Sequence, residues 1–347
     1  MKKRLIAYVI LFVALSSCID EIYLSVPASE SNLVIDAWLG STSEQSYVRV
    51  YRSGSYLSGS TQPNYTKVAT TSIYVEDESG RRVYFPNTAD TTLLHQPNAG
   101  QSFPAGMKYR VHVNTRDGAY ESEWVLMPEP STFGDFEAVA REKSLFVISG
   151  SSPVRVIGTT VDLTLQASNS SGEEVGYLIE ADGISEVFTT GDAENCRCNC
   201  YLEEPLFVTG MNLGSGSDVP SPIILAELEV TSLGRFYLQS TIRTIPKANL
   251  DYLRQIDKQR RNTGSIFDPA PFKIRGNIKN LDNPDEEVLG NFMAYQEVEY
   301  NRMVYRADIY RLNQQFPFVF DEVGHVSEDC KDYYPFTLPY TPAPFQP

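Results

Sequence analysis

Leu33-Val34-Ile35-Asp36-Ala37-Trp38-Leu39 and Tyr47-Val48-Arg49-Val50-Tyr51 are the two stretches that decide the fold class. The first is a short, mostly apolar run rich in branched and aromatic residues, and it stops at Gly40. The second alternates with a period of two, which places one set of side chains on each face of a strand. Both patterns predict β-strands and indicate a mainly β fold.

Strand-like runs continue beyond this pair, and turn sequences such as Glu78-Ser79-Gly80 and Asp117-Gly118 separate them. About seven strands within roughly 100 residues are typical of an immunoglobulin-like or related β-sandwich. Met127-Pro128-Glu129-Pro130 then interrupts the pattern. We therefore predict a first sandwich over residues 32–130 and a second domain over residues 131–347.

The second domain is also rich in strand-like runs, and it contains one helical pattern. Ser232-Leu233-Gly234 is typical of a hairpin turn between two of the strands. The helix is expected at about residues 248–262, preceded by Pro246, capped by Asn249 and ended by Gly264. These features predict a second antiparallel β-sandwich or half-open barrel with one packed helix.

The N-terminus carries the pattern of a bacterial lipoprotein signal. Lys2-Lys3-Arg4 precedes an apolar run from Leu5 to Leu15, and the small residues Ser16 and Ser17 stand before Cys18. The apolar run is too short to span a bilayer, which takes about 20 residues, and it fits a signal peptide. We predict that residues 1–17 are removed, that Cys18 is lipidated, and that residues 18–31 form a tether.

Asp20 and Glu21 follow the lipidation site. They resemble the acidic tag that sends lipoproteins of the Bacteroidetes to the outer face of the outer membrane, although an ordinary solvated tether has the same composition. The surface-exposed leaflet is therefore favoured over the periplasmic one. The fatty acyl chains on Cys18 are the expected membrane anchor.

The charge of the chain excludes one large class of partner. Removing residues 1–17 takes away three basic residues and no acidic one, so the formal net charge falls from −15 to −18. Nucleic-acid-binding proteins present basic faces, and a chain this acidic is not expected to bind nucleic acid.

Four cysteines remain after lipidation: Cys196, Cys198, Cys200 and Cys330. Exported proteins meet an oxidising compartment, so disulfides are expected, and four cysteines allow three pairings. Cys330 is expected to bond to one of the other three and to hold the C-terminal tail. The single-residue spacing within Cys196–Cys200 is tight for a thiolate metal site, so no metal is expected.

The sequence gives no catalytic motif, and we expect neither an enzyme nor a cofactor. His95 and His325 lie in loops, whereas His112 lies between two valines and points away from the face that they bury. With 44 acidic residues, a convergent carboxylate pair is compatible with the sequence but nothing singles one out.

Residues 52–66 have the Tyr, Ser and Gly composition of adaptable binding loops. Tyr51, Tyr56 and Tyr65 are the candidate ligand contacts. A long hairpin connection with no binding role explains the same composition equally well.

The block from the helix to residue 292 resembles domain-of-unknown-function family 4249 (DUF4249), lipoproteins of the Bacteroidetes. The matching residues are Asn262-Thr263-Gly264-Ser265-Ile266-Phe267-Asp268-Pro269-Ala270-Pro271, Ile274-Arg275-Gly276-Asn277-Ile278, Asp282-Asn283-Pro284-Asp285-Glu286-Glu287-Val288-Leu289-Gly290-Asn291-Phe292 and, earlier, Gly106-Met107-Lys108-Tyr109 with Glu121-Ser122-Glu123-Trp124. The resemblance implies no activity. It implies an accessory lipoprotein beside a TonB-dependent outer-membrane transporter, with a role in nutrient capture or surface assembly.

Within that block, Gly276 and Gly290 are expected to permit close backbone approach, and the acidic residues 282–287 are expected to form a solvated turn, not a calcium loop. The leading functional hypothesis is a non-enzymatic, lipid-anchored outer-membrane protein that binds a substrate or partner beside such a transporter. A structural or adhesive surface lipoprotein is the alternative, and a hydrolase with a convergent carboxylate site is a further one.

Overall fold

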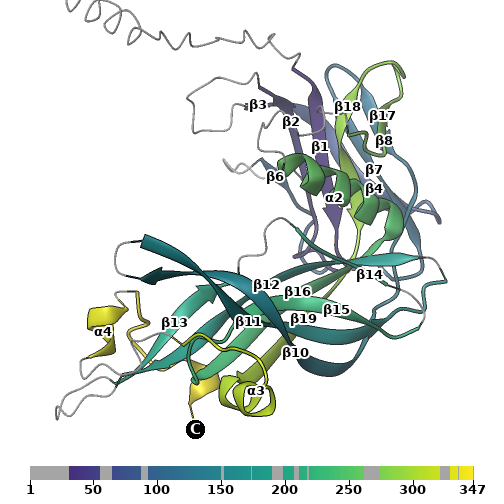
Figure 1. Ribbon diagram of the computed structural model, residues 1–347. Helices are drawn as coiled ribbons and strands as arrows, with labels where there is room; N and C mark the ends of the chain where they lie inside the picture. The colour runs from purple at the N-terminus through teal and green to yellow at the C-terminus, as the bar shows by residue number, and fades with distance from the viewer. Residues whose placement is uncertain are drawn as a thin grey trace, which may run out of the picture.

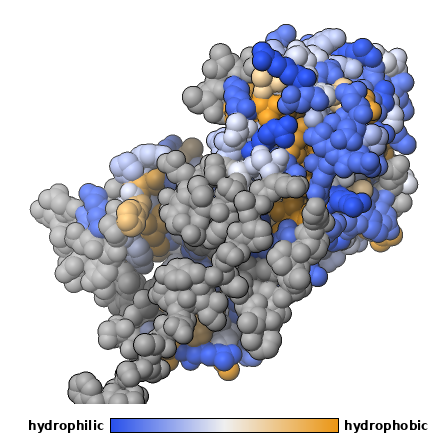
Figure 2. Space-filling model, turned by 90° about the horizontal axis from the view of Figure 1, so that it is seen from above, coloured by the Kyte–Doolittle hydropathy of each residue, from blue (hydrophilic) through white to orange (hydrophobic). Residues whose placement is uncertain are grey.

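The computed structural model consists of two β-sandwiches, which we call the upper and lower sandwich from their places in Figure 1, with helix α2 (Lys247–Arg260) against the upper one. The described surface of the upper sandwich is mostly hydrophilic, with a few apolar residues showing between (Figure 2). The structure describes residues 31–54, 65–86, 93–149, 152–172, 174–189, 198–206, 211–216, 219–261, 274–320, 329–334 and 336–346.

Two sheets form the upper sandwich. The first has the order β18-β1-β2-β3, with β6 also paired to β2; the second has the order β17-β8-β7-β4-β5, with β9 also paired to β7. The strands are β1 (Leu33–Leu39), β2 (Tyr47–Ser53), β3 (Tyr65–Lys67), β4 (Thr70–Asp77), β5 (Arg82–Tyr84), β6 (Leu94–His95), β7 (Lys108–Thr115), β8 (Ala119–Ser122), β9 (Val125–Leu126), β17 (Ile278–Asn280) and β18 (Val288–Ala294).

The alternation read from the sequence decides which face of each strand is buried. Leu33, Ile35 and Leu39 on β1 are at most 1% exposed and pack against Val48 and Val50 on β2 in the upper core. The residues between them, such as Trp38 and Arg49, point to the outer face of the sheet. The mainly β class is confirmed.

The upper sandwich contains strands from two separate parts of the chain, which differs from the expected division at residue 130. β18 pairs in parallel with β1, and β17 pairs with β8, so residues 278–294 return to complete it. The chain then goes back to the lower sandwich, where β19 pairs with β16, so both sandwiches are discontinuous in sequence. A local strand pattern carries no information on its pairing partner, so the sequence boundary assigned these two strands to the wrong sandwich.

Two glycines allow this return, as expected from their positions. Gly290 has a φ of +97°, and a Cβ there would lie 2.0 Å from the carbonyl oxygen of Ile35. A Cβ on Gly276 would lie 1.5 Å from the carbonyl oxygen of Gly290. Only residues without a side chain fit where these backbones meet.

The lower sandwich also has two sheets, ordered β10-β11-β15 and β13-β12-β16-β19, with β14 also paired to β12. Its strands are β10 (Thr132–Ser149), β11 (Ser152–Ser168), β12 (Val175–Phe188), β13 (Asn199–Pro205), β14 (Asn212–Ser215), β15 (Ser221–Glu229), β16 (Arg235–Pro246) and β19 (Gln296–Tyr305). Because β15 and β16 belong to different sheets, the hairpin expected at residues 232–234 is wrong: the chain crosses between sheets there.

Helix α2 packs where the two sandwiches meet. Its Leu250 and Leu253 are buried in a small core with Met293 and Tyr295 from the end of the upper sandwich and Ile245 from the lower. The expected helix is confirmed in position.

The expected N-cap of α2, Asn249, is not confirmed. The N-cap residue is Pro246, and the buried Asn249 donates from Nδ2 to the carbonyl of Phe292 at 3.1 Å. Asn249 is used for packing against β18 and not for capping. Gly264 lies outside the described residues.

Short helices follow β19 in the C-terminal part of the chain. They are α3 (Arg306–Leu312), α4 (Cys330–Tyr333) and the 3-10 helix η2 (Ala343–Phe345). Among the described residues, no helix has both the length and the apolar character needed to cross a bilayer.

Candidate functional site

A cleft of about 580 Å³ lies between α2 and the outer face of the β18-β1-β2 sheet. In Figure 1, α2 lies across these three strands. The sheet contributes the outward-facing positions of β1 and β2, and the helix contributes Tyr252, Leu253 and Ile256. The cleft exists because α2 covers only part of a sheet face whose other side is already buried.

Aromatic rings form much of the cleft wall. Trp38 stacks on Tyr47 of the neighbouring strand with ring centroids 6.3 Å apart, and it meets Tyr295 edge-on at 5.8 Å. Tyr51 and Tyr252 line the same space from the sheet and the helix. Such rings bind organic ligands through their faces at low conformational cost.

The hydroxyl groups of these tyrosines remain protonated at physiological pH. Burial raises the pKa of Tyr252 to about 12, and burial also raises that of Tyr295 to about 12. The Tyr295 hydroxyl donates to the carbonyl of Gln45 at 2.6 Å, which fixes the ring beside Trp38. These tyrosine rings are therefore uncharged at physiological pH.

Asp36 is the acidic group of β1 that lines the cleft. Its Oδ1 accepts a hydrogen bond from Nε1 of Trp38 at 2.8 Å, whereas Oδ2 lies 3.9 Å from Nη1 of Arg49. The guanidinium of Arg49 rests over the ring of Tyr47 at 4.8 Å. Burial raises the pKa of Asp36, because the hydrogen bond from Trp38 and the distant Arg49 only partly offset the loss of water.

The remaining charge in the cleft is also negative. Glu287, which precedes β18, lines it, and Gln259 of α2 is a neutral neighbour. Among the described lining residues there is no lysine or arginine. The cleft therefore combines ring faces with carboxylates.

The three tyrosines predicted as ligand contacts lie in different places relative to the cleft. Tyr51 lines the cleft, and Tyr65 on β3 lies beside it with ring centroids 5.7 Å apart, although Tyr65 is not among the lining residues. Tyr56 lies outside the described residues. The prediction for Tyr51 and Tyr65 as ligand contacts stays a prediction, since no ligand is present.

Sequence reasoning missed Asp36, Trp38, Tyr47 and Tyr252. The signal was available for the first three, because period-two alternation places them on the face opposite to the buried residues of β1 and β2. What the sequence lacked was the knowledge that α2 would cover that face.

A second group of charged residues lies on the outer face of the other upper sheet. Glu76 accepts from Nη2 of Arg110 at 2.8 Å and from Nε of Arg82 at 2.9 Å, and His112 Nε2 lies 3.2 Å from its Oε2. Glu121 contacts Nη1 of Arg110 at 2.9 Å. The arginine hydrogen bonds, that from Arg110 first, lower the pKa of Glu76 to about 2. All of these charges are compensated within the sheet.

The histidines belong to the structure of the upper sandwich. His112 points to the face opposite Val111 and Val113, as expected, but it is only 8% exposed, because Tyr74 stacks on it at 4.5 Å. His95, expected in a loop, instead lies on β6, where it pairs with Val48 of β2 and is only 3% exposed. His325 lies outside the described residues.

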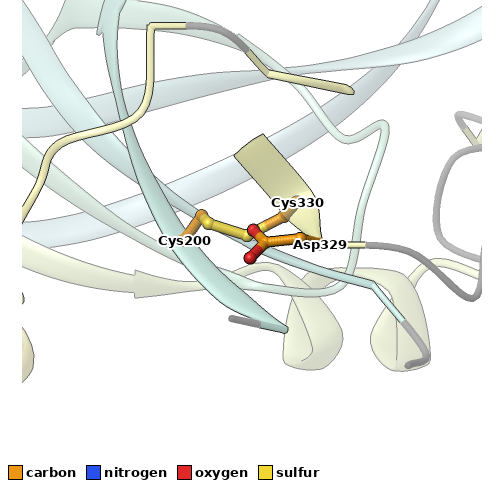
Figure 3. A group of neighbouring side chains, drawn as sticks. All are labelled: Cys200, Asp329 and Cys330. Carbon is orange, nitrogen blue, oxygen red and sulfur yellow. A yellow bond between two sulfur atoms is a disulfide. The ribbon is translucent and has the colours of Figure 1, made fainter. Parts of the chain in front are cut away.

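A disulfide joins Cys200 on β13 to Cys330 on α4 with a Cα–Cα distance of 6.2 Å (Figure 3). The expectation that Cys330 bonds to one of the three clustered cysteines is confirmed. Asp329 lies beside the pair and caps α4, accepting from the backbone N–H of Lys331 at 3.0 Å. Cys198 is also disulfide-bonded, and Cys196 and Cys18 lie outside the described residues. The sulfurs of Cys200 and Cys330 bind each other and offer no thiolate to a metal.

Comparison with known proteins gives one match. The sequence model of the family described as Domain of unknown function (DUF4249) matches residues 19–301. No curated protein and no solved structure shows a significant match.

Proposed function

The chain belongs to the DUF4249 family, whose function is unknown, and from this premise we propose that it is a non-enzymatic, lipid-anchored outer-membrane protein that binds a ligand in the cleft beneath α2. The observation that carries the binding role is the cleft itself: a concave site of about 580 Å³ with four aromatic side chains on its walls. Such a site has the size and composition of a small-molecule or side-chain pocket.

The attachment rests on the N-terminal signal. The basic start, the short apolar run and the Ser-Ser-Cys sequence ending at Cys18 support lipidation, and the negative net charge of the mature chain disfavours binding to anionic headgroups. Asp20 and Glu21 support the outer leaflet. A TonB-dependent transporter is the proposed partner, to which the protein delivers its ligand.

The chain offers a direct reporter for the cleft. It has two tryptophans, Trp38 in the cleft and Trp124 on the opposite outer face. In a Trp124→Phe variant, emission comes from Trp38 alone. Titration with amino-acid amides, short peptides and linear oligosaccharides is expected to shift that emission for at least one class.

A matched pair of substitutions locates the binding. Tyr252→Ala removes a cleft ring and is expected to weaken binding of the responding ligand about tenfold or more. Tyr340→Ala removes a ring that is 62% exposed on the C-terminal tail and is expected to change nothing. Equal effects of the two substitutions, with both proteins folded by circular dichroism, would contradict the proposed site.

Anchoring and partnership have separate tests. Mass spectrometry of the mature N-terminus is expected to show acylated Cys18, and Cys18→Ser is expected to release the protein from membranes. Copurification of the tagged protein is expected to recover a TonB-dependent transporter; recovery without one contradicts the partner but leaves the cleft untouched.

A hydrolase is the second candidate, and one observation favours keeping it. Asp36 and Glu287 both line the cleft, and glycoside hydrolysis uses two carboxylates. Turnover of an oligosaccharide that Asp36→Asn and Glu287→Gln each abolish would establish it. Binding without turnover supports the proposed non-enzymatic role.

A further inference from the structure

The charge of the cleft beneath α2 has one sign. Asp36 and Glu287 are the charged side chains among its described lining residues, and the chain as a whole carries a formal charge of −15. A cleft with carboxylates and low-dielectric aromatic walls focuses a negative potential and disfavours anionic ligands. It attracts cations.

Asp36 lacks the compensation that the same protein gives to its structural acids. Trp38 supplies one neutral hydrogen bond to Oδ1, and Arg49 of the neighbouring strand stays 3.9 Å from Oδ2. Glu76, by contrast, is held by two arginines at 2.8 and 2.9 Å and by His112 at 3.2 Å. A carboxylate removed from water gains most when a cation reaches it directly.

The rings beside Asp36 suit the same kind of ligand. Trp38 and Tyr47 are stacked next to the carboxylate, and the guanidinium of Arg49 already lies over Tyr47 at 4.8 Å. This contact shows that a planar cation fits against the ring of Tyr47. Cations are attracted to aromatic faces, and the attraction grows as the cation is removed from water.

We propose that the cleft binds a ligand through an ammonium or guanidinium group, which pairs with Asp36 and lies against the rings of Trp38 and Tyr47. This inference rests on the proposed function, because it names the ligand class of the same cleft. A free amine and a basic side chain of a peptide share this chemistry.

Matched probes test the charge without changing the shape. In the Trp124→Phe background, Nα-acetyl-arginine amide is compared with Nα-acetyl-citrulline amide, and Nα-acetyl-lysine amide with Nα-acetyl-norleucine amide, by Trp38 emission and calorimetry. Each cationic probe is expected to bind about tenfold more tightly than its neutral partner, and raising the salt concentration is expected to reduce that difference.

Variants then assign the effect to Asp36. Asp36→Asn is expected to remove the preference for the cationic probe. Asp251→Asn is the matched control, because Asp251 lies on α2, pairs with Arg254 and does not line the cleft. Arg49→Gln removes the competing cation and is expected to tighten binding of the cationic probe about threefold.

The outcomes separate the two proposals. Equal binding of charged and neutral probes, or a preference that Asp36→Asn leaves intact, overturns the cationic ligand while the binding cleft stands. If neither the probes nor the peptides and oligosaccharides perturb Trp38, the cleft itself is overturned. Loss of the preference in Asp251→Asn as well as in Asp36→Asn would also contradict a specific role for Asp36.

Discussion

The two outer faces of the upper sandwich use similar side chains in opposite ways. Each face has an acidic residue near a tryptophan and an arginine over an aromatic ring: Asp36 with Trp38 on one sheet, Glu76 and Arg110 with Trp124 on the other. On the second sheet the acid is surrounded by cations and its pKa falls to about 2. On the first it is half-buried with little compensation, and the loss of water raises its pKa.

The difference separates an acid that stabilises the fold from one that is available to a ligand. Glu76 has its charge neutralised within the sheet, so nothing remains for a partner. Asp36 carries a desolvation cost that its neighbours do not offset. Clefts in which an acid is left in this state are candidates for binding sites.

The largest expected effect comes from disturbing the pairing of β18 with β1 in the sheet that supports the cleft. Gly290→Ala brings a Cβ to 2.0 Å from the carbonyl of Ile35 at a φ of +97°, and we expect a loss of about 3 kcal/mol or more in the free energy of unfolding. Gly80→Ala is the matched control in the opposite sheet. Its φ is +86°, but no described atom lies within 4 Å of the added Cβ, so the loss is expected to be about 1 kcal/mol. Urea denaturation measures both, and equal losses would contradict the steric argument.

Glu76→Gln is expected to cost about 2 kcal/mol at neutral pH, because it removes charged hydrogen bonds to two arginines. The lowered pKa sets the pH dependence. The stabilisation from Glu76 is present above its unfolded pKa of 4.5 and is lost as the pH falls towards 2. The difference between wild type and variant should therefore shrink over that range, as followed by thermal melts. A stability difference that does not change with pH would show that the effect does not come from ionisation of Glu76.

Exchanging the arginines tests how each face uses its cation. Arg110 contacts Glu76 through two nitrogens and Glu121 through a third, an arrangement that lysine cannot reproduce. Arg110→Lys is expected to cost about 1 kcal/mol, whereas Arg49→Lys, whose ion pair is 3.9 Å long, should stay within about 0.5 kcal/mol of wild type. If Arg49→Lys were the more costly change, the two faces would not differ as described.

Asp36→Asn is expected to have the smallest effect, within about 0.5 kcal/mol of wild type and on the stabilised side, since it removes a half-buried, poorly compensated charge. The raised pKa gives the opposite sign to Glu76. Its destabilising contribution exists above the unfolded pKa of 3.8 and disappears as the pH falls. The stability of the wild type should therefore rise relative to that of Asp36→Asn as the pH falls. A clear loss of stability in Asp36→Asn at neutral pH would make Asp36 a structural residue.

The sequence predicted the elements better than their partners. The alternation in residues 47–51 correctly identified the buried face of β2, and the helical pattern placed α2 to within two residues at each end. The run from Leu289 to Val298 reads as one strand, but the structure divides it between β18, which ends at Ala294, and β19, which begins at Gln296 in the other sandwich. The parallel pairing of β18 with β1 was not readable, because nothing local distinguishes a strand of one sandwich from a strand of the other.

The candidate site follows the same rule. Tyr51 was predicted from composition. The outward position of His112 was predicted from periodicity, but the burial of His112 depends on Tyr74 from another strand. Asp36 and Trp38 became candidates only when α2, more than 200 residues later in the chain, was seen to cover their face. Long-range contacts of this kind are invisible to windowed patterns.

The return of residues 278–294 to the upper sandwich has a consequence for the order in which the molecule is built. Strands β1 and β2 are synthesised first, yet the edge of β1 remains open until β18 emerges, after the whole of β10 to β16 and α2. An open strand edge is a template for incorrect pairing, and contacts this distant in sequence form slowly. The ribosome therefore makes β1 and β2 of the cleft early, and α2 and β18 late. A nascent chain that ends before about residue 294 has no complete cleft, so it can bind a ligand only after β18 has been made.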